Sequence, residues 1–191
     1  MRLLIDIAVA IVIATTIGLG TAWYAVDHGT PFNALTIGAW TAFPLSGSPD
    51  ADPYSIARLA RTGEVPLGAG EGLAFISDSD SAGVPLAGNC TYNVAGQMPT
   101  ARLWTLTAYG ADGRLMATPA GRYSLDSREV VRRPDGSSDI TVSTAVQPGN
   151  WLPVAPLAHF RLMLRLYDTP VTIGGRAADQ VMPNISRGRC H

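Results

Sequence analysis

Charged residues are scarce in this sequence, and so are the side chains on which most enzymes depend. Only 15% of its 191 residues are Asp, Glu, Lys or Arg, whereas soluble domains average about 25%. The formal net charge is −1, so there is no basic surface to neutralise the phosphates of a nucleic acid. The composition therefore excludes nucleic acid as an expected partner.

Motifs that identify an active site are absent. The three histidines lie far apart, at His28, His159 and His191, and no His-Glu-x-x-His or Cys-x-x-Cys pattern occurs, so we expect no metal. There is no Gly-x-Ser-x-Gly elbow and no phosphate-binding glycine loop, so we expect no cofactor and name no catalytic residue. A hydrolase built on a pair of carboxylates stays open as an alternative.

The segment Asp78–Gly83 contains an Asp-x-Asp pair followed by glycine, as calcium loops do. The third ligand and the distal glutamate of an EF-hand are not in register, however. We therefore expect a solvated hairpin loop at this position.

One long hydrophobic run does occur, at the N-terminus. Ile7–Ala25 is a stretch of 19 uncharged residues, long enough to cross a bilayer as a helix. Arg2 precedes the run and Asp27 follows it, so the positive-inside rule leaves the N-terminus in the cytoplasm and the rest of the chain outside. The alternative is a signal peptide cleaved near Gly20–Ala22, which would release a secreted domain.

These features divide the chain into three parts. Residues 1–26 are the predicted transmembrane anchor (or uncleaved signal), residues 27–51 a juxtamembrane linker, and residues 52–191 an extracytoplasmic domain. Within the anchor, small residues recur every four positions and form one stripe, along which a second helix can approach closely. The stripe predicts pairing with another copy or another subunit, and its residues are Ala10, Ala14, Gly18 and Ala22.

A single soluble helix is predicted between Asp52 and Gly63. Asp52 suits the N-cap, a proline follows at the first helical position, and Gly63 suits the C-terminal end. We interpret Arg58 and Arg61 as exposed residues that favour the negative end of the helix dipole. The expected apolar face consists of Ile56, Leu59 and Ala60.

Apolar and polar residues alternate most clearly in the segment Phe160–Tyr167. A period of two places alternate side chains on opposite faces of a strand, and Pro156 and Pro170 leave too few residues for a helix. We therefore predict a strand with one buried face, formed by Phe160, Leu162, Leu164 and Leu166. Its other face carries Arg161, Met163, Arg165 and Tyr167.

Other short β-type runs alternate with turn clusters, as in all-β domains. They cover residues 36–43, 73–77, 90–94, 102–109, 114–116, 123–125, 129–132 and 140–146. Turns are predicted at Ala111–Gly113 and Pro134–Gly136. Beyond Pro170 the pattern indicates little regular structure.

Four motifs occur in a fixed order: Arg102-Leu-Trp-Thr-Leu-Thr-Ala-Tyr109, Gly121-Arg-Tyr-Ser124, Asn150-Trp-Leu-Pro153 and Arg165-Leu-Tyr167. Together they resemble domain-of-unknown-function family 1214, over most of Gly72–Arg187. The resemblance implies an antiparallel β-sandwich of jelly-roll type. It also implies a partner, because members often follow an N-terminal half of family 1254. Here an anchor and a short helix stand in that place, so the partner is expected to be a separate polypeptide.

The two cysteines, Cys90 and Cys190, are both expected outside the reducing cytoplasm, where they most simply form a disulfide. Two unrelated buried thiols are the alternative. We expect a single-pass protein of the bacterial inner membrane, in contact with lipid through its anchor and with its domain in the periplasm.

Aromatic and cationic side chains are the remaining candidates for a site. On one outer face they would stack on a sugar ring or hold a carboxylate. Alternatively the tryptophans belong to the core and the arginines pair locally. The candidate residues are Trp104, Tyr109, Arg122, Tyr123, Trp151, Arg165 and Tyr167.

Three functions follow from these observations. The favoured one is a non-catalytic docking or accessory module for another envelope protein. The others are a module that binds a carbohydrate or carboxylate, and a hydrolase with an unrecognised site. A pocket lined by Arg165 and aromatic residues would favour the ligand-binding module.

Overall fold

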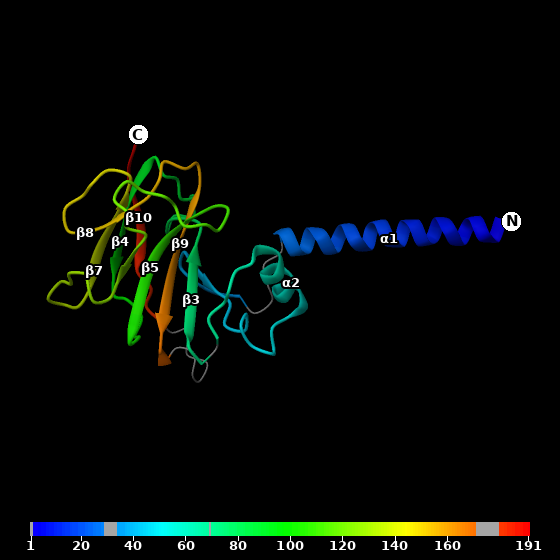
Figure 1. Cartoon of the computed structure of the whole chain (residues 1–191), viewed down its shortest axis with the longest axis horizontal. Coiled ribbons are helices and arrows are strands. Elements are labelled where there is room, and N and C mark those ends of the chain that lie inside the picture. The colour runs from blue at the N-terminus through cyan, green and yellow to red at the C-terminus, as the bar shows by residue number, and fades with distance from the viewer. Residues whose placement is uncertain (1, 29–33, 69, 171–179) are drawn as a thin grey trace.

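The computed structural model describes residues 2–28, 34–68, 70–170 and 180–191. A long helix, α1 (Arg2–His28), projects away from a β-sandwich, and a short helix, α2 (Pro53–Thr62), lies where the two meet (Figure 1). The apolar part of α1 is not buried against the rest of the chain, and its length and composition suit a membrane span. The helix is consistent with a membrane anchor or a signal sequence.

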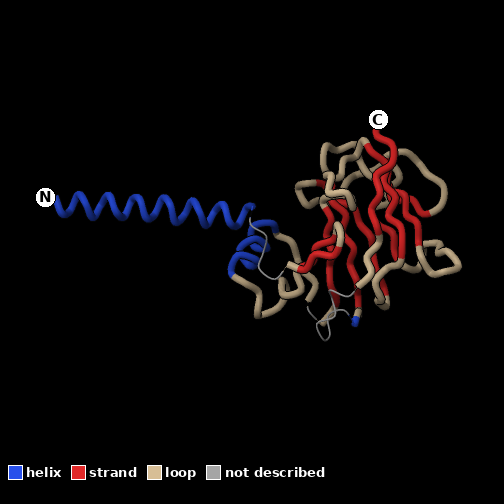
Figure 2. The backbone as a smooth tube through the Cα atoms, turned by 180° about the vertical axis from the view of Figure 1, so that it is seen from behind, coloured by secondary structure: helices blue, strands red, loops and turns tan. Residues whose placement is uncertain are grey.

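The sandwich consists of a six-stranded and a four-stranded sheet (Figure 2). The larger sheet has the order β1 (Leu35–Ile37), β2 (Trp40–Ala42), β3 (Gly72–Ser77), β9 (Phe160–Tyr167), β5 (Leu103–Gly110) and β6 (Ser124–Asp126). The smaller sheet has the order β10 (Asn184–Cys190), β4 (Cys90–Gly96), β7 (Ser138–Ser143) and β8 (Asn150–Pro153). Neighbouring strands are antiparallel except β7 and β8, which are parallel. The predicted fold class, a mainly β sandwich with one short helix after an apolar N-terminal helix, is confirmed.

Strand β9 lies inside the larger sheet, between β3 and β5. Its four predicted core residues are at most 2% exposed, so the predicted buried face is confirmed. They pack between the sheets, where the Phe160 ring meets the Tyr92 ring of β4 edge to face at 5.7 Å. The alternate positions of β9, among them Arg161, Met163 and Arg165, lie on the outer face of the larger sheet.

Helix α2 begins and ends as predicted. The Asp52 side chain accepts hydrogen bonds from the backbone N–H groups of Tyr54 and Ser55, each at 3.0 Å. The predicted apolar face is wrong, because Ile56 is 54% exposed and Ser55 is only 5% exposed. Ser55 and Leu59, one turn apart, instead form the side that faces the sheet.

Residues 36–43 form a hairpin of two strands and not the predicted single strand. The left-handed backbone at Gly38 (φ +58°) turns the chain between β1 and β2, so that Thr36 pairs with Thr41. Trp40 is 1% exposed, and its indole N–H donates to the Pro183 carbonyl at 2.8 Å. Both strands therefore belong to the larger sheet, within a segment expected to be a linker.

Three of the other predicted strands are shorter or absent. Residues 114–116 and 129–132 form only single bridges, at Leu115 and Arg132. Strand β7 ends at Ser143, whose hydroxyl donates to the Ala145 carbonyl at 2.6 Å, and Val146 is 78% exposed. The predicted turns at Ala111–Gly113 and Pro134–Gly136 do form, with hydrogen bonds that close each of them.

The prediction of little regular structure beyond Pro170 is wrong for the last strand. Residues 171–179 lie outside the described residues, but Asn184–Cys190 forms β10 and pairs with β4. Ile185 is the one buried side chain of this strand, so its sequence lacks the alternation that identifies a half-buried strand.

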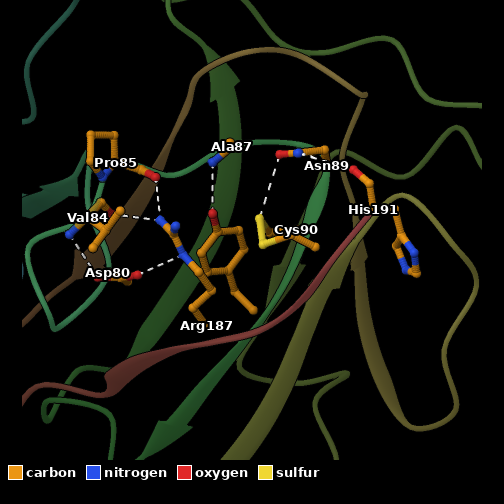
Figure 3. Close-up of a disulfide and its surroundings, with 10 residues drawn as sticks. Asp80, Val84, Pro85, Ala87, Asn89, Cys90, Arg187 and His191 are labelled. Atoms are coloured by element: carbon orange, nitrogen blue, oxygen red, sulfur yellow. Dashed lines mark hydrogen bonds and ion pairs between the residues drawn. A yellow bond between two sulfur atoms is a disulfide. The ribbon is translucent and has the colours of Figure 1, made fainter.

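Cys90 and Cys190 form the predicted disulfide. They are paired residues of β4 and β10, and the bond is drawn in yellow in Figure 3. Beside it, the His191 backbone N–H donates to the Asn89 carbonyl at 2.8 Å, and the Asn89 side chain donates to the His191 carbonyl at 3.2 Å. Because disulfides persist in oxidising compartments, this bond indicates an extracytoplasmic domain.

The loop after β3 forms the expected hairpin turn, closed by the Ser79–Pro85 bridge, and most of its residues are exposed, but Asp80 is buried. Asp80 is 3% exposed, and its side chain accepts hydrogen bonds from the N–H groups of Ala82 at 3.0 Å and Val84 at 2.9 Å. The Ser81 N–H donates to the Ile185 carbonyl of β10 at 2.9 Å. The burial of Asp80 was missed because no pattern in the sequence indicates β10, which packs against this loop.

Candidate functional site

A cleft of about 560 Å³ lies between the end of α1, helix α2 with the loop that follows it, and the outer face of the larger sheet. Val26 and Asp27 contribute the α1 side, and Tyr109, Met163 and their neighbours the sheet side. The volume is in the range of small-ligand sites. The polar and charged residues that line it are Asp27, Arg58, Arg61, Glu64, Tyr109, Asp112, Arg161 and Arg165.

Arg61 joins α2 to the end of α1. Its Nη1 atom lies 2.7 Å from Asp27 Oδ1, and its guanidinium carbon lies 4.1 Å from the centre of the Trp23 ring. Both charged side chains are partly exposed, so the ion pair alone contributes less than about 1 kcal/mol. The stacked cation–π contact adds about 0.5 to 1 kcal/mol. The sequence interpretation of Arg61 as an exposed helix-end residue did not include this contact.

Arg165 and Tyr109 form the sheet side of the cleft. Arg165 Nη1 donates to Tyr109 Oη at 2.8 Å, and the guanidinium carbon lies 5.4 Å from the ring centre. Four residues earlier on the same strand face, Arg161 Nε lies 3.1 Å from Asp78 Oδ1. Among the residues that the structure describes, Arg58 and Arg165 have no carboxylate within ion-pair distance. Among the described residues they are the two cleft arginines without a direct ion pair, and the carboxylates of Glu64 and Asp112 line the same cleft.

A smaller recess of about 70 Å³ adjoins the cleft, and six residues line both: Arg58, Glu64, Val65, Arg161, Met163 and Arg165. Most of its other walls are apolar. They include Phe43, Leu59, Pro66, Leu67, Leu73 and Ile76. The cationic side chains thus lie between a polar cleft and an apolar recess, which is an arrangement that suits an amphipathic anion.

Only two of the predicted aromatic and cationic residues, Arg165 and Tyr109, line the cleft. Trp104 is 3% exposed and belongs to the core between the sheets. Tyr167 is partly buried at the end of β9, opposite Leu103 of β5. For Trp104 the structure agrees with the alternative that the tryptophan is a core residue.

The other three residues of the set lie away from the cleft. The Trp151 indole N–H donates to the Ser143 carbonyl at 3.1 Å and so joins β8 to β7. Arg122 Nη1 donates to the Trp151 carbonyl at 3.4 Å. Tyr123 is 44% exposed. Arg122 and Trp151 therefore make local contacts with backbone carbonyls.

The stripe of small residues on α1 is open. Ala10, Ala14, Gly18 and Ala22 are exposed, and a Cβ atom added at Gly18 would meet no other atom within 4 Å. Nothing in the described chain covers the stripe, and its pairing with a second helix stays a prediction.

Three carboxyl groups have a lowered pKa, and each belongs to a cap or a turn. Hydrogen bonds from the side-chain hydroxyls of Ser55 and Ser137 lower the pKa of Asp52 and Asp135. The backbone N–H of Arg128 does the same for Asp126. None of the three lines the cleft. Within the described ranges, no group of three His, Cys, Asp or Glu residues could hold a metal ion.

Sequence reasoning found part of this cleft and missed the rest. The alternation in β9 placed Arg161 and Arg165 on one outer face, which the structure confirms. Arg58 and the end of α1 were missed, because no local pattern indicates which face of a sheet a preceding helix covers. The one relevant indication was a cap-defined helix with two arginines in its second half.

The protein-family model described as "Protein of unknown function (DUF1214)" matches residues 71–171. A comparison with curated proteins gives no significant match. Among solved structures, the chain is similar to the VPA0106 protein from Vibrio parahaemolyticus, with 24% identity and a TM-score of 0.62. This match covers 92% of the present chain and 43% of the Vibrio chain. An uncharacterized protein from Burkholderia cenocepacia is 21% identical, with a TM-score of 0.44 over 93% of this chain and 52% of that one.

The likeness to the Vibrio protein shows the fold alone, and the present chain spans less than half of that protein's length. The family model, in contrast, covers more than half of the present chain, from β3 to the end of β9. The four motifs that resemble the family all lie within the matched residues. The chain therefore belongs to the DUF1214 family, a family of proteins of unknown function.

Proposed function

We propose that this chain is a membrane-anchored, extracytoplasmic binding module whose cleft holds an anionic ligand without converting it. The observation that carries the proposal is that Arg58 and Arg165 line one cleft with no carboxylate at ion-pair distance among the described residues. A guanidinium offers a planar fork of donors that fits carboxylate and phosphate oxygens. The ligand class is therefore a small carboxylate or phosphate.

The compartment is part of the proposal. Helix α1 suits a membrane anchor, and the Cys90–Cys190 disulfide suits an oxidising compartment. Arg2 precedes the apolar run and Asp27 follows it, which supports a cytoplasmic N-terminus and a periplasmic domain at the bacterial inner membrane.

A carbohydrate is less well supported than an anion. Sugar rings stack on exposed aromatic faces, but Trp104 is in the core and the Trp151 indole is bound to β7. Among the described residues, Tyr109 is the one aromatic residue that lines the cleft, and its hydroxyl accepts a hydrogen bond from Arg165. Arginines are the most numerous polar residues of the cleft, with four guanidinium groups against three carboxylates.

The proposal is tested by the melting temperature of the full chain in detergent, because a ligand that binds only the folded state stabilises it. We expect malonate and glycerol phosphate to raise the melting temperature, and glucose to leave it unchanged. The double variant Arg58→Gln, Arg165→Gln should lose this shift. The matched control Arg102→Gln, Arg128→Gln, which removes two exposed arginines outside the cleft, should keep it. Equal shifts in both double variants would contradict the site.

Docking to a separate envelope protein is a second candidate, and the length of the Vibrio protein favours it. More than half of that chain lies outside the match. A partner polypeptide of the family-1254 type, or a second copy of this chain, would supply the corresponding part here. Docking and self-association both require a protein partner, whereas the cleft would bind a small ligand.

The docking candidate is tested by crosslinking in intact membranes. The sequence contains no lysine, so photoreactive residues are better probes than amine-reactive reagents. Suitable positions are Val131 and Val146, which are 73% and 78% exposed. One crosslinked protein recovered from both positions supports docking. Diffuse crosslinks without a common protein count against it.

A further inference from the structure

The cleft lies at the depth of lipid headgroups when α1 spans a membrane. The uncharged run Ile7–Ala25 is 19 residues long, and at about 1.5 Å per residue it extends about 28 Å. The hydrocarbon core of a bilayer is about 30 Å thick, so this run fills it. Val26 and Asp27, the next two residues, therefore reach the headgroup region, and both line the cleft.

Helix α2 is held at the same level. Arg61 stacks on Trp23 and pairs with Asp27, so the side of the cleft formed by α2 is attached directly to the end of α1. Trp23 and Tyr24 also occupy the last turns of the apolar run, where aromatic side chains favour the membrane–water interface. The cleft is thus not carried away from the membrane on a long linker, and its ligand can come from the lipid itself.

The lining of the cleft is that of a site for an amphipathic anion. Four arginines face three carboxylates, and Arg58 and Arg165 are the two without a carboxylate partner among the described residues. Beside these cations lie Val26 and Val65, the latter 87% exposed, and the apolar recess adjoins the same arginines. A freely soluble anion would use the cations alone, whereas a lipid would use both kinds of surface.

We propose that the cleft binds the headgroup of an anionic phospholipid from the outer leaflet of the membrane in which α1 is anchored. The phosphate lies between Arg58 and Arg165, which offer the bidentate donors that phosphate oxygens accept. This inference rests on the proposed anionic site and specifies the source of its ligand. A free phosphate ester has the same binding chemistry, and the experiment separates the two sources.

The test uses the full chain in nanodiscs of phosphatidylcholine with and without phosphatidylglycerol. Native mass spectrometry after transfer to mild detergent counts the lipid that each chain retains. We expect one phosphatidylglycerol per chain, and at least a tenfold lower occupancy in Arg58→Gln, Arg165→Gln. The control Arg102→Gln, Arg128→Gln should retain the lipid as the unmodified chain does. Equal retention by both double variants would identify lipid that merely surrounds α1, and would overturn the inference.

A second arm separates this inference from the proposed function. Glycerol phosphate is titrated against the chain in nanodiscs of phosphatidylcholine alone, with the melting temperature as readout. A shift that depends on Arg58 and Arg165, without retention of phosphatidylglycerol, overturns the lipid as ligand and keeps the anion site. No shift and no retained lipid overturns both. If Arg165→Gln disturbs folding through Tyr109, then Arg58→Gln against Arg128→Gln provides the same comparison.

Discussion

Arg187 of β10 binds Asp80, a carboxylate that is 3% exposed, with its Nε atom 2.9 Å from Asp80 Oδ2 (Figure 3). The same guanidinium donates from Nη2 to the Pro85 carbonyl at 2.6 Å and lies 5.5 Å from the centre of the Tyr92 ring. One side chain of the smaller sheet therefore holds the loop that follows β3 of the larger sheet. The pair fixes the last strand to both layers of the sandwich.

Replacing Arg187 with methionine should lower the free energy of unfolding by about 2 to 4 kcal/mol, because it leaves the Asp80 carboxylate buried without its cation. Urea denaturation measures the change. The matched control is Arg189→Met on the same strand, where the side chain is exposed and little change is expected. Adding Asp80→Asn to Arg187→Met should recover part of the loss, since the two residues interact directly. Equal losses for Arg187→Met and Arg189→Met would show that the ion pair contributes nothing.

Removing the disulfide should also destabilise the domain. The two cysteines are 100 residues apart in sequence, and the chain-entropy model gives about 4 to 5 kcal/mol for a loop of that length. We expect Cys90→Ser, Cys190→Ser to melt at a clearly lower temperature than the unmodified protein. Reducing agent should lower the melting temperature of the unmodified protein and leave that of the double variant unchanged. A melting temperature unaffected by either treatment would contradict this expectation.

Leu164 and Arg165 are neighbours on β9 with opposite expected roles. Leu164→Ala should cost about 2 to 5 kcal/mol of stability, because the side chain is fully buried between the sheets and its loss leaves a cavity. Arg165→Ala should reduce anion or partner binding more than it reduces stability, because the residue faces the cleft. Thermal melts and binding assays on both variants make the comparison. If Arg165→Ala proves as destabilising as Leu164→Ala, then Arg165 is a structural residue.

The cap of α2 should depend on pH through Asp52. The Ser55 hydroxyl donates to the carboxylate at 2.5 Å and, with the backbone N–H groups of Tyr54 and Ser55, lowers the pKa of Asp52 below 3.8. A lowered pKa means that the folded state prefers the ionised form, so the contribution is complete above pH 3.8 and is lost as the pH falls through the lowered value. Asp52→Asn keeps a capping oxygen and cannot titrate. Between pH 5 and pH 2 the free energy of unfolding should therefore fall more steeply for the unmodified protein than for this variant. An equal pH dependence of the free energy in both proteins would refute the assignment.

The small-residue stripe of α1 gives a prediction about assembly. Gly18→Ile would place a branched side chain where a second helix must come close, and should abolish association measured by crosslinking in membranes. Gly20→Ile, the same change on another face of the helix, should leave association intact, since a Cβ added at Gly20 also meets no atom within 4 Å. Association that persists in inserted Gly18→Ile protein would identify α1 as a simple tether.

The core of the fold was predictable because its information is local. The period-two pattern of β9 and the cap and glycine of α2 describe a few consecutive residues, and the structure confirms both. The Cys90–Cys190 pair was equally accessible, since only two cysteines exist. The resemblance of four motifs to the DUF1214 family supplied the sandwich that local patterns do not specify.

The parts that failed depend on contacts between distant segments. Strand β10 has one buried side chain, so its existence depends on pairing with β4, about 100 residues earlier in the chain. In the sequence, Asp80 has the pattern of an exposed loop residue, and its burial depends on the ion pair with Arg187 of β10. The cleft combines the end of α1, α2 and β9. The residues around Arg58 in the sequence do not indicate that its side chain lines this cleft.

Strand β10 follows every other strand in chain order, yet it completes the smaller sheet beside β4 and brings Cys190 to Cys90. The disulfide therefore closes one covalent loop that contains β5 to β9. A single proteolytic cut inside that loop would leave the two fragments of the domain joined, so the cut becomes visible on a gel only after reduction.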